Sequence, residues 1–431
     1  MKIVILDGAL ENTPQNWNAY LSDLVLTLRK KDHQVNHFIL KDNDIHHCAG
    51  CFKCWVQTPG MCVFDDDSRE INRVIINSDF VLFASPLVMG FPTSVLKKKM
   101  DRMIPLVHPY SEIVLGETHH IHRYVKSPLF GLLLQPESAD TKENIPIVSQ
   151  VFARTALNIK SRLAFTVTTE ESVRKTAARI ENLENEHYEF SREFPELETE
   201  KVGKMRKLTV FNGSPRGKRG NTPTLLKHLM DGFTSIVGNT AEIYHLQQIK
   251  KKTEFTSHFQ NAECVLIGFP LYTDGMPGIV KEFIEELQPL TRRERNPPIG
   301  FMVQSGFAEA LHSRYVEQYL MELADRLHSP YLGALVRGGC EGVRLQPEKM
   351  NRKMFSALHT LGQQLGEQGG FERQSVKEFC SFERISPVLV PLVKLVGKLP
   401  FMKMYWDIQL NKNDTFEGRF ARPYEETVVG G

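Results

Sequence analysis

The feature that most constrains the fold of this chain is an alternation of short apolar runs with segments of helical periodicity, which occurs twice in succession. Runs that are apolar throughout are typical of strands buried on both faces of a parallel sheet. Strict alternation of such strands with helices predicts an α/β fold with two tandem domains, each a five-stranded parallel sheet with helices on both faces. The predicted strands are residues 2–6, 35–40, 80–85, 129–135 and 162–167, then residues 207–213, 241–246, 263–269, 299–304 and 331–336.

A charged stretch around Pro195 interrupts the pattern and is the predicted linker. Two domains are also expected from the length of 431 residues, which exceeds one ordinary core. Near the end, an apolar segment at 386–401 contains prolines that disfavour a long helix, and we expect it to pack across the pair of domains. The predicted organisation is a first domain of residues 1–186, a linker of 187–206, a second domain of 207–374 and a C-terminal extension of 375–431.

The two halves also share a sequence pattern. ASPLVMGFPTSVLKKKM (84–100) and GFPLYTDGMPGIVKEFI (268–284) align without gaps. Each contains Pro-Leu just past a predicted strand and a lysine eleven residues after that proline. This similarity indicates an internal duplication.

Composition excludes several classes of function. The formal net charge is +2, and no basic stretch is interleaved with aromatic residues, so no nucleic-acid partner is expected. No stretch approaches the roughly twenty apolar residues that a membrane helix needs, so no membrane span is expected. The opening MKIVILDGAL reads as a buried strand rather than a signal peptide, and seven cysteines fit a reducing compartment. We therefore expect a cytoplasmic protein.

The strongest local motif is NGSPRGKRGNT (212–222), which directly follows a predicted strand and directly precedes a predicted helix. A loop in this position points backbone N–H groups at an anion, which the helix dipole favours. Thr222 is the predicted N-cap, and the loop lacks the Lys-Ser/Thr pair of ATP-hydrolysing P-loops. A glycine-rich turn without a ligand is the alternative. Close approach would rest on Gly213, Gly217 and Gly220, and phosphate contacts on Ser214, Arg216, Asn221 and Thr222.

The motif GSPRGKRGNT, followed by a strand and PLYTDGMPGIVK, resembles the superfamily of NADPH-dependent FMN reductases and flavodoxin-like quinone reductases. The resemblance covers about residues 207–370 and implies doubly wound sheets of strand order 2-1-3-4-5. It implies that the first loop holds the FMN phosphate and that two later loops lie along the flavin. The implied cofactor-binding residues are Ser214, Arg216, Gly220, Asn221 and Thr222, then Pro270, Leu271, Tyr272, Thr273, Asp274, Gly275 and Met276, then Ser305, Gly306 and Phe307.

The activity implied by this resemblance is transfer of electrons from NAD(P)H through FMN to a quinone, a free flavin or another small-molecule acceptor. No side-chain acid or base is required, because the flavin carries the chemistry. A flavodoxin-like electron carrier between protein partners is the alternative, and a scaffold with decayed flavin sites is a third hypothesis. Family members usually work as oligomers, so the duplicated chain is expected to form an internal pseudo-dimer, with homo-oligomers also open.

The first half resembles the same superfamily over about residues 1–185, with one departure. Its first loop, LDGALENTPQNWN (6–18), contains no arginine and carries Glu11, which would repel a phosphate. Its second loop, SPLVMGFP, keeps Pro86, Leu87 and Gly90 as candidate cofactor contacts. Whether this half binds FMN stays open.

Four of the seven cysteines fall within CAGCFKCWVQTPGMC (48–62). Cys48, Cys51, Cys54 and Cys62 follow the spacing of iron–sulfur flavoproteins of this superfamily, and the resemblance implies a [4Fe–4S] cluster. Thiols that are structural or redox-active are the main alternative. Zinc is a weaker one, because zinc sites usually space two Cys-x2-Cys pairs further apart.

Three histidines, His119, His120 and His122, lie close together in GETHHIHRYV (116–125). Imidazoles bind zinc, copper or iron, so a metal site is one hypothesis. Without a nearby carboxylate pattern, ordinary surface or cleft histidines are the favoured interpretation.

Overall fold

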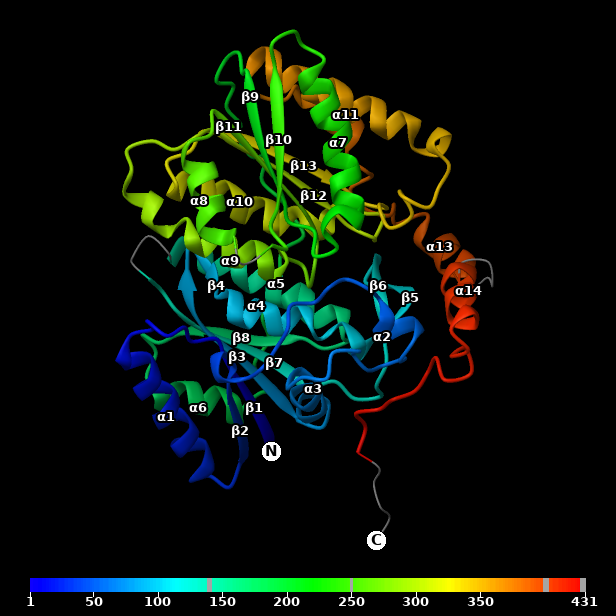
Figure 1. Ribbon diagram of the computed structural model, residues 1–431. Coiled ribbons are helices and arrows are strands. Elements are labelled where there is room, and N and C mark those ends of the chain that lie inside the picture. Colours follow the sequence, from blue (N-terminus) through cyan, green and yellow to red (C-terminus); the bar gives the residue numbers. More distant parts are fainter. Residues whose placement is uncertain (138–141, 249–250, 398–402, 427–431) are drawn as a thin grey trace. The chain divides into compact units, whose positions relative to one another are not determined.

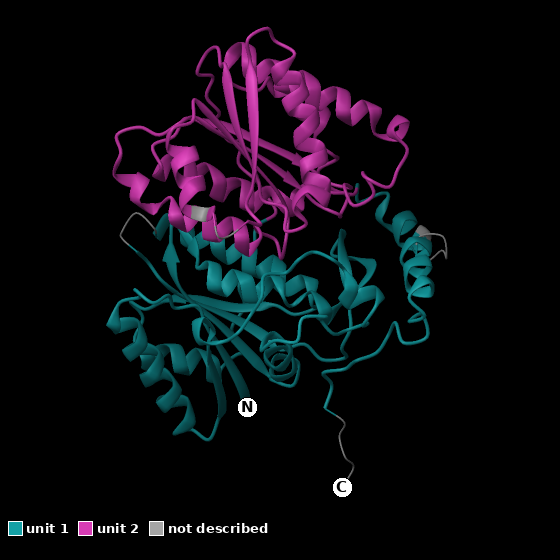
Figure 2. Ribbon diagram, in the orientation of Figure 1, with its two compact units in different colours: residues 1–191, 386–431 teal, residues 192–385 magenta. Residues whose placement is uncertain are grey.

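The computed structural model describes residues 1–137, 142–248, 251–397 and 403–426. Contacts within the chain divide it into two compact units, unit 1 of Met1–Ser191 and Ser386–Gly431 and unit 2 of Arg192–Ile385 (Figure 2). The first boundary falls inside the predicted linker. The predicted C-terminal extension divides at Ser386, and its residues 398–402 and 427–431 lie outside the described residues.

Unit 1 begins with the predicted alternation of strands and helices (Figure 1). Its C-terminal part returns after unit 2 as two further helices. The elements are β1 (Lys2–Asp7), α1 (Gln15–Arg29), β2 (Gln34–Ile39), α2 (Lys53–Val56), α3 (Ser68–Ile76), β3 (Phe80–Val88), β4 (Phe91–Pro92), α4 (Ser94–Asp101), β5 (Val107–Val114), β6 (Glu117–His122), β7 (Leu129–Gln135), α5 (Asn144–Asn158), β8 (Leu163–Thr168), α6 (Val173–Glu181), α13 (Val390–Val396) and α14 (Met404–Lys412).

The sheet of unit 1 has the strand order β2-β1-β3-β7-β8, and these strands pair in parallel. This confirms the predicted order 2-1-3-4-5. Two features were not predicted: β4 pairs antiparallel to the end of β3, and β5 and β6 form a separate antiparallel hairpin. The hairpin escaped detection because β6, ETHHIH, has a single apolar residue, Ile121, and lacks the apolar run that marks the other strands.

Apolar side chains fill both faces of this sheet. On one face, Trp17, Leu21 and Leu24 of α1 belong to a buried cluster that also contains Ile180 of α6. On the other face, the ring of Phe83 in β3 lies 5.3 Å from that of Phe152 in α5. Helices therefore cover both faces, as a parallel sheet requires.

Unit 2 repeats the same alternation without the added hairpin. Its elements are β9 (Lys207–Asn212), the 3-10 turn η4 (Gly217–Arg219), α7 (Asn221–Thr234), β10 (Thr240–His245), α8 (Lys252–Gln260), β11 (Cys264–Pro270), α9 (Gly278–Glu286), β12 (Ile299–Gln304), α10 (Arg314–Arg326), β13 (Tyr331–Arg337), α11 (Glu348–Gln368) and α12 (Arg373–Phe379).

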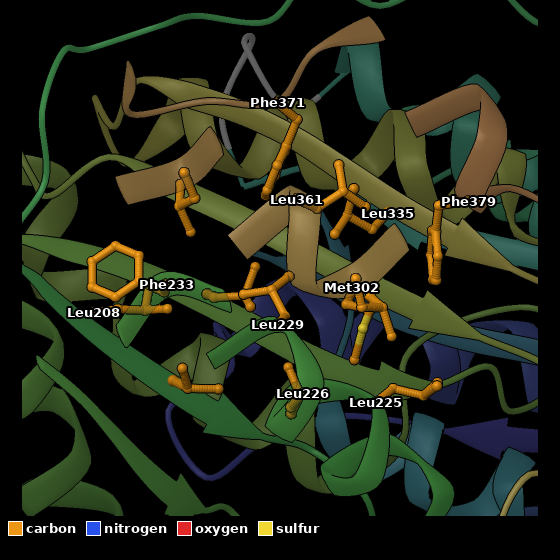
Figure 3. Close-up of a cluster of buried hydrophobic side chains, with 14 of the residues drawn as sticks. Leu208, Leu225, Leu226, Leu229, Phe233, Met302, Leu335, Leu361, Phe371 and Phe379 are labelled. Atoms are coloured by element: carbon orange, nitrogen blue, oxygen red, sulfur yellow. The ribbon is translucent and has the colours of Figure 1, made fainter. Parts of the chain in front are cut away.

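The sheet of unit 2 has the order β10-β9-β11-β12-β13, again parallel and as predicted. One face is covered by α7 and α11, whose leucines interdigitate with those of the strands (Figure 3). The opposite face carries an aromatic cluster in which Phe211 of β9 lies 4.8 Å from Phe283 of α9. The labelled residues of the first cluster are Leu208, Leu225, Leu226, Leu229, Phe233, Met302, Leu335, Leu361, Phe371 and Phe379.

Within the described ranges, no helix combines the length and apolarity needed to cross a membrane.

Candidate functional site

The first loop of unit 2 leaves the sheet in close contact with the neighbouring strand. The N–H of Gly213 donates to the carbonyl of Gly268 in β11 at 2.7 Å. A Cβ atom on Gly213 would lie 2.3 Å from Cγ2 of Val280. Only glycine therefore fits at this exit from β9.

The start of α7 has no side-chain cap on its N–H groups. The helix begins at Asn221 with Gly220 as N-cap, so Thr222, the predicted N-cap, lies inside the first turn instead. A Cβ atom on Gly220 would lie 2.2 Å from Oγ of Ser214, so the Ser214 hydroxyl sits directly against the helix start. An uncapped helix N-terminus beside a hydroxyl is a ready site for an anion.

Asn212, the last residue of β9, organises the interior of the loop. Its Oδ1 accepts the N–H of Ser214 at 3.1 Å, and its Nδ2 donates to the carbonyl of Gly217 at 3.2 Å. Gly217 has a φ of 55°, in the region that favours glycine. The loop conformation is thus fixed by its own hydrogen bonds.

Arg216 is paired with a residue that the sequence did not single out. Its Nη1 and Nη2 both lie 3.4 Å from Oε1 of Glu341, in the loop after β13. The carbonyl of Glu341 also accepts from Nδ2 of Asn221 at 3.1 Å. Burial raises the pKa of Glu341, and the charge of Arg216 opposes that effect. A fourth loop therefore reaches two of the residues predicted to bind phosphate, Arg216 and Asn221.

The second loop is a tight turn after β11. Tyr272 and Gly275 exchange two backbone hydrogen bonds of 2.9 Å each. The residues between them, Thr273 and Asp274, have φ values of 40° and 56°. Positive φ at residues other than glycine is a strained conformation that clusters at functional sites. Met276, which follows, is fully buried and anchors the loop to the core.

Hydrogen bonds join the three loops at the carboxyl ends of adjacent strands. The N–H of Leu271 donates to the carbonyl of Gln304 at 2.8 Å. Nε2 of Gln304 donates to Oγ1 of Thr222 at 3.2 Å. In the third loop, Oγ of Ser305 donates to the carbonyl of Phe307 at 3.1 Å. Gln304, the polar end of an otherwise apolar strand, was missed by the sequence analysis, although that contrast could have revealed it.

The structure thus brings together the predicted residues of unit 2 at the point where strand order reverses, which is where such sheets bind ligands. Pro270 forms the end of β11, and Gly306 is exposed in the third loop. A surface pocket elsewhere in unit 2 involves none of them. It is lined by Lys349, Arg352, Lys353, Ser356, Ala357, Thr360, Ser375 and Glu378.

In unit 1 the first loop has the same backbone contact but different chemistry. The N–H of Gly8 donates to the carbonyl of Ala84 at 2.8 Å, as Gly213 does in unit 2. Where β9 ends in Asn212, β1 ends in Asp7, which is 2% exposed. Oδ1 of Asp7 accepts the N–H of Ala9 and Nε1 of Trp17, both at 2.9 Å. A carboxylate inside the loop repels a phosphate.

The second loop of unit 1 is a hairpin rather than an open loop. Pro86 and Leu87 lie inside β3, and Leu87 pairs with Pro92 of β4. Gly90 has a φ of 75°, and a Cβ atom there would lie 2.8 Å from Oδ1 of Asn144. The predicted strand end at residue 85 was therefore too early, because pairing with β4 extends the strand to Val88.

The four clustered cysteines are neighbours in unit 1, and none forms a disulfide. Cys54 is buried, Cys48 and Cys62 are half-buried, and Cys51 is exposed. Burial raises the pKa of Cys54 well above its usual range, and charge on Cys48, Cys62 or Cys51 would raise it further. Cys48, Cys51 and Cys62 thus all lie close enough to Cys54 for their charge to affect its pKa. We therefore treat the four thiols as one candidate site.

This cysteine site does not have the geometry of a single-ion site. Over the part of the chain that the structure describes, no three His, Cys, Asp or Glu side chains converge to hold one metal ion. Zinc requires four ligands that converge on one point. Thiolates of a four-iron cluster instead bind at separate corners. Among the described residues, the side chains as placed therefore do not assemble a single-ion zinc site.

The three histidines of the hairpin have other contacts. Nδ1 of His119 lies 2.9 Å from Oδ1 of Asn158, and Nδ1 of His122 lies 2.8 Å from the carbonyl of Tyr124. The ring of His120 lies 5.1 Å from that of Trp55. These contacts favour a structural role for the three histidines, but His119 and His122 are buried and do not lie on the surface.

Fold and loops together define a flavodoxin-like protein with a glycine-rich loop and an uncapped helix start at the switch point of its second sheet. A family model described as NADPH-dependent FMN reductase matches residues 1–114 and again residues 206–336. The chain therefore belongs to the NADPH-dependent FMN reductase family, and the two matches confirm the predicted tandem arrangement.

Three curated relatives are iron–sulfur flavoproteins of archaea. That of Archaeoglobus fulgidus is 31% identical over 93 residues, which cover 22% of this chain and 41% of the relative. One from Methanocaldococcus jannaschii is 28% identical over 89 residues, which cover 21% and 44%. A second from that organism is 26% identical over 106 residues, which cover 25% and 53%. The chain thus spans about half the length of these relatives.

Similar solved structures include an FMN-dependent NADH-azoreductase from Bacillus anthracis in complex with FMN, at 12% identity and a TM-score of 0.31. It covers 38% of this chain and 100% of the azoreductase chain. A quinone reductase from Klebsiella pneumoniae is 14% identical with a TM-score of 0.31, covering 40% and 90%.

Proposed function

We propose that this protein is an FMN-dependent oxidoreductase that passes electrons from NAD(P)H to a quinone, a free flavin or another small acceptor. The observation that carries the proposal is the loop of unit 2, where an uncapped helix start, a buried Ser214 hydroxyl and the Arg216 guanidinium adjoin. These are the groups that a terminal phosphate needs. The proposal draws its chemistry from the family and not from the distant solved structures.

The residues that would hold FMN divide between its two ends. The first loop offers donors to the phosphate, and the second and third loops offer rigid backbone to the ring. When bound, FMN supplies the capacity to accept a hydride and to release electrons to an acceptor. The proposed binding residues are Ser214, Arg216, Gly220, Asn221 and Thr222 for phosphate, and residues 270–276 and 305–307 for the ring.

The protein contributes position and environment rather than an acid or base. Thr273 and Asp274 have strained backbone conformations. The two hydrogen bonds between Tyr272 and Gly275 keep the turn in this conformation and so fix the orientation of its backbone groups. Hydrogen bonds from Leu271 and Gln304 lock this turn to the neighbouring loops. Such preorganisation lowers the cost of ordering a ligand.

We further propose that Cys48, Cys51, Cys54 and Cys62 bind an iron–sulfur cluster, a [4Fe–4S] cluster by donor number. Support comes from the mutual proximity of the four thiols and the absence of disulfides among the described cysteines. Three relatives are named iron–sulfur flavoproteins, which agrees with this assignment. A cluster would let the protein relay single electrons.

The test is a spectrum of protein purified without oxygen, with flavin, iron and sulfide assayed on the same sample. FMN affinity is then compared between wild type, Arg216→Gln and the matched control Lys218→Gln. We expect Arg216→Gln to weaken FMN binding by about tenfold to hundredfold, since a hydrogen bond to a charged group contributes about 1.5–3 kcal/mol. Lys218 is exposed in the same loop, so its variant should bind normally.

Three results would separate the hypotheses. Bound FMN with NAD(P)H oxidation supports the oxidoreductase. Bound FMN without NAD(P)H oxidation favours the electron carrier instead. Protein that binds no flavin would overturn the proposal.

A further inference from the structure

Arg123, between β6 and β7, is a buried cation with an incomplete set of partners. It is 2% exposed. Its Nε donates to the carbonyl of Pro105 at 3.0 Å, and its Nη1 donates to the carbonyls of Arg419 and Ala421, both at 2.9 Å. Its Nη2 is buried and has no hydrogen-bond partner.

Carbonyl dipoles are the only hydrogen-bond partners of this guanidinium among the described residues, and no described carboxylate pairs with it. Arg102, by contrast, forms a bidentate ion pair with Asp66. Its Nη1 lies 2.6 Å from Oδ2 and its Nη2 lies 2.9 Å from Oδ1 of that carboxylate. Burial lowers the pKa of Arg123 to about 10, so it stays charged at neutral pH. A buried charge without a counter-ion is strongly destabilising, so a fold that keeps one is expected to balance it with a bound anion.

The cysteine site, once it holds the proposed cluster, would be the nearby source of negative charge. A Cβ atom on Gly60 would lie 3.1 Å from Cδ of Arg123, so the arginine stem packs on the loop between Cys54 and Cys62. The N–H of Gly60 donates to the carbonyl of Cys54 at 2.9 Å. Negative charge at Cys54 would favour the charged form of Arg123.

The C-terminal strap, residues 404–426, holds this arrangement in place. Besides the two carbonyls that bind Arg123, Nε of Arg422 donates to the carbonyl of Arg123 at 2.9 Å. Oγ1 of Thr415 donates to the carbonyl of Val56, two residues after Cys54, at 2.7 Å. The rings of Trp406 and Trp55 lie 5.2 Å apart, and α14 packs against α2. The strap is therefore a structural part of the cysteine site.

We propose that Arg123, clamped by the C-terminal strap, is the buried counter-charge of the anionic iron–sulfur cluster bound by the four cysteines. This inference rests on the cluster assignment proposed above. Arg123 acts through space as a positioning residue and is no ligand. A fixed positive charge stabilises the more negative, reduced form of the cluster and so raises its reduction potential.

The experiment uses the full chain, purified without oxygen, as wild type, Arg123→Gln, Arg123→Lys and the control Glu417→Ala, an exposed position on the strap. Iron and sulfide content and the cluster midpoint potential are measured, with FMN content and thermal unfolding as reports of the fold. We expect Arg123→Gln to lower the cluster midpoint potential by at least about 59 mV. For one electron, this is a tenfold shift of the oxidised-to-reduced ratio toward the oxidised form at a fixed potential. Arg123→Lys should restore most of that shift, and Glu417→Ala should show none.

If Arg123→Gln does not fold, the inference can be tested with variants that loosen the strap but keep the charge of Arg123. Arg422→Ala and Thr415→Val should each make the cluster bleach faster with an iron chelator than it does in Glu417→Ala. The inference would be overturned if these two variants bleached no faster than Glu417→Ala, or if Arg123→Gln folded with the wild-type potential and iron content. Either result would leave the cluster assignment standing. Wild-type protein with FMN but without iron would overturn the cluster and the inference together, and leave the flavin proposal standing.

Discussion

At the scale of single residues, the least expected neighbour of the phosphate loop is Glu341. Its carboxylate competes for the guanidinium of Arg216, which a bound phosphate also needs. Both side chains are partly exposed, at 33% and 24%, so the pair is weak. Removing this competitor should favour FMN.

We predict that Glu341→Gln tightens FMN binding at neutral pH by up to about fivefold, since exposed ion pairs contribute about 0.2–1 kcal/mol. The raised pKa of Glu341 adds a pH dependence. As pH falls through that pKa, wild-type Glu341 takes up a proton and loses its hold on Arg216. The ratio of wild-type to variant Kd should therefore approach one at low pH and increase as pH rises.

The measurement is a titration of FMN fluorescence against pH for both proteins. Taking the ratio of the two Kd values cancels the titration of the FMN phosphate itself, whose second pKa is near 6. A ratio that does not change with pH would show that Glu341 plays no such part.

Sequence reasoning found the residues that carry a local signature and missed those that act at a distance. Ser214 and Arg216 sit in a glycine-rich loop between a strand and a helix, which is visible in the sequence. Glu341 reaches the same place from 125 residues further along the chain, and only strand order brings it there. Asp7 was equally invisible, because one carboxylate at a strand end has no pattern of its own.

At the scale of elements, the helix that carries the phosphate loop depends on a close crossing with α11. A Cβ atom on Gly232 of α7 would lie 1.9 Å from the carbonyl oxygen of His359 in α11. A Cβ atom on Gly362 would lie 2.0 Å from the carbonyl oxygen of Leu229 in α7. Backbone atoms cannot move aside as side chains do, so these glycines set the distance between the helices.

We predict that Gly362→Ala lowers the free energy of unfolding by about 1–3 kcal/mol, the usual cost of overpacking a core, and also weakens FMN binding by displacing α7. Gly366→Ala is the matched control, because a Cβ atom there would meet the side-chain ends of Ile236 and Asn239 and no backbone within 3 Å. Urea unfolding and FMN titration of both variants test this. Equal stability of the two would contradict it.

Elements with a strong period were predictable, and elements defined by pairing were not. All ten strands of the two main sheets overlap predicted runs, because strands buried on both faces must be apolar. The β3–β4 and β5–β6 hairpins escaped prediction because their pairing partners, and not their composition, make them strands.

At the scale of the whole molecule, the two halves have kept one architecture and diverged in chemistry. The sheets share strand order, and both first loops make the same backbone contact to the next strand. Unit 2 has Asn212 and Arg216 where the loop of unit 1 has Asp7 and no arginine. That the two halves associate as an internal pseudo-dimer stays a prediction.

We predict that each chain binds one FMN rather than two, because the buried carboxylate of Asp7 opposes a phosphate in unit 1. Flavin released by acid from saturated, desalted protein, measured against chain concentration, gives the ratio. A ratio of two would contradict the assignment of unit 1 as flavin-free.

The position of the strap in the sequence affects when the cysteine site is completed during synthesis. Residues 404–426 complete the cysteine site, but they follow all of unit 2 along the chain. During synthesis the four cysteines are therefore made early and enclosed last, after a whole domain has emerged and folded. We expect this order to keep the thiols open to an iron donor while unit 2 is being made and to close the site once the strap has left the ribosome.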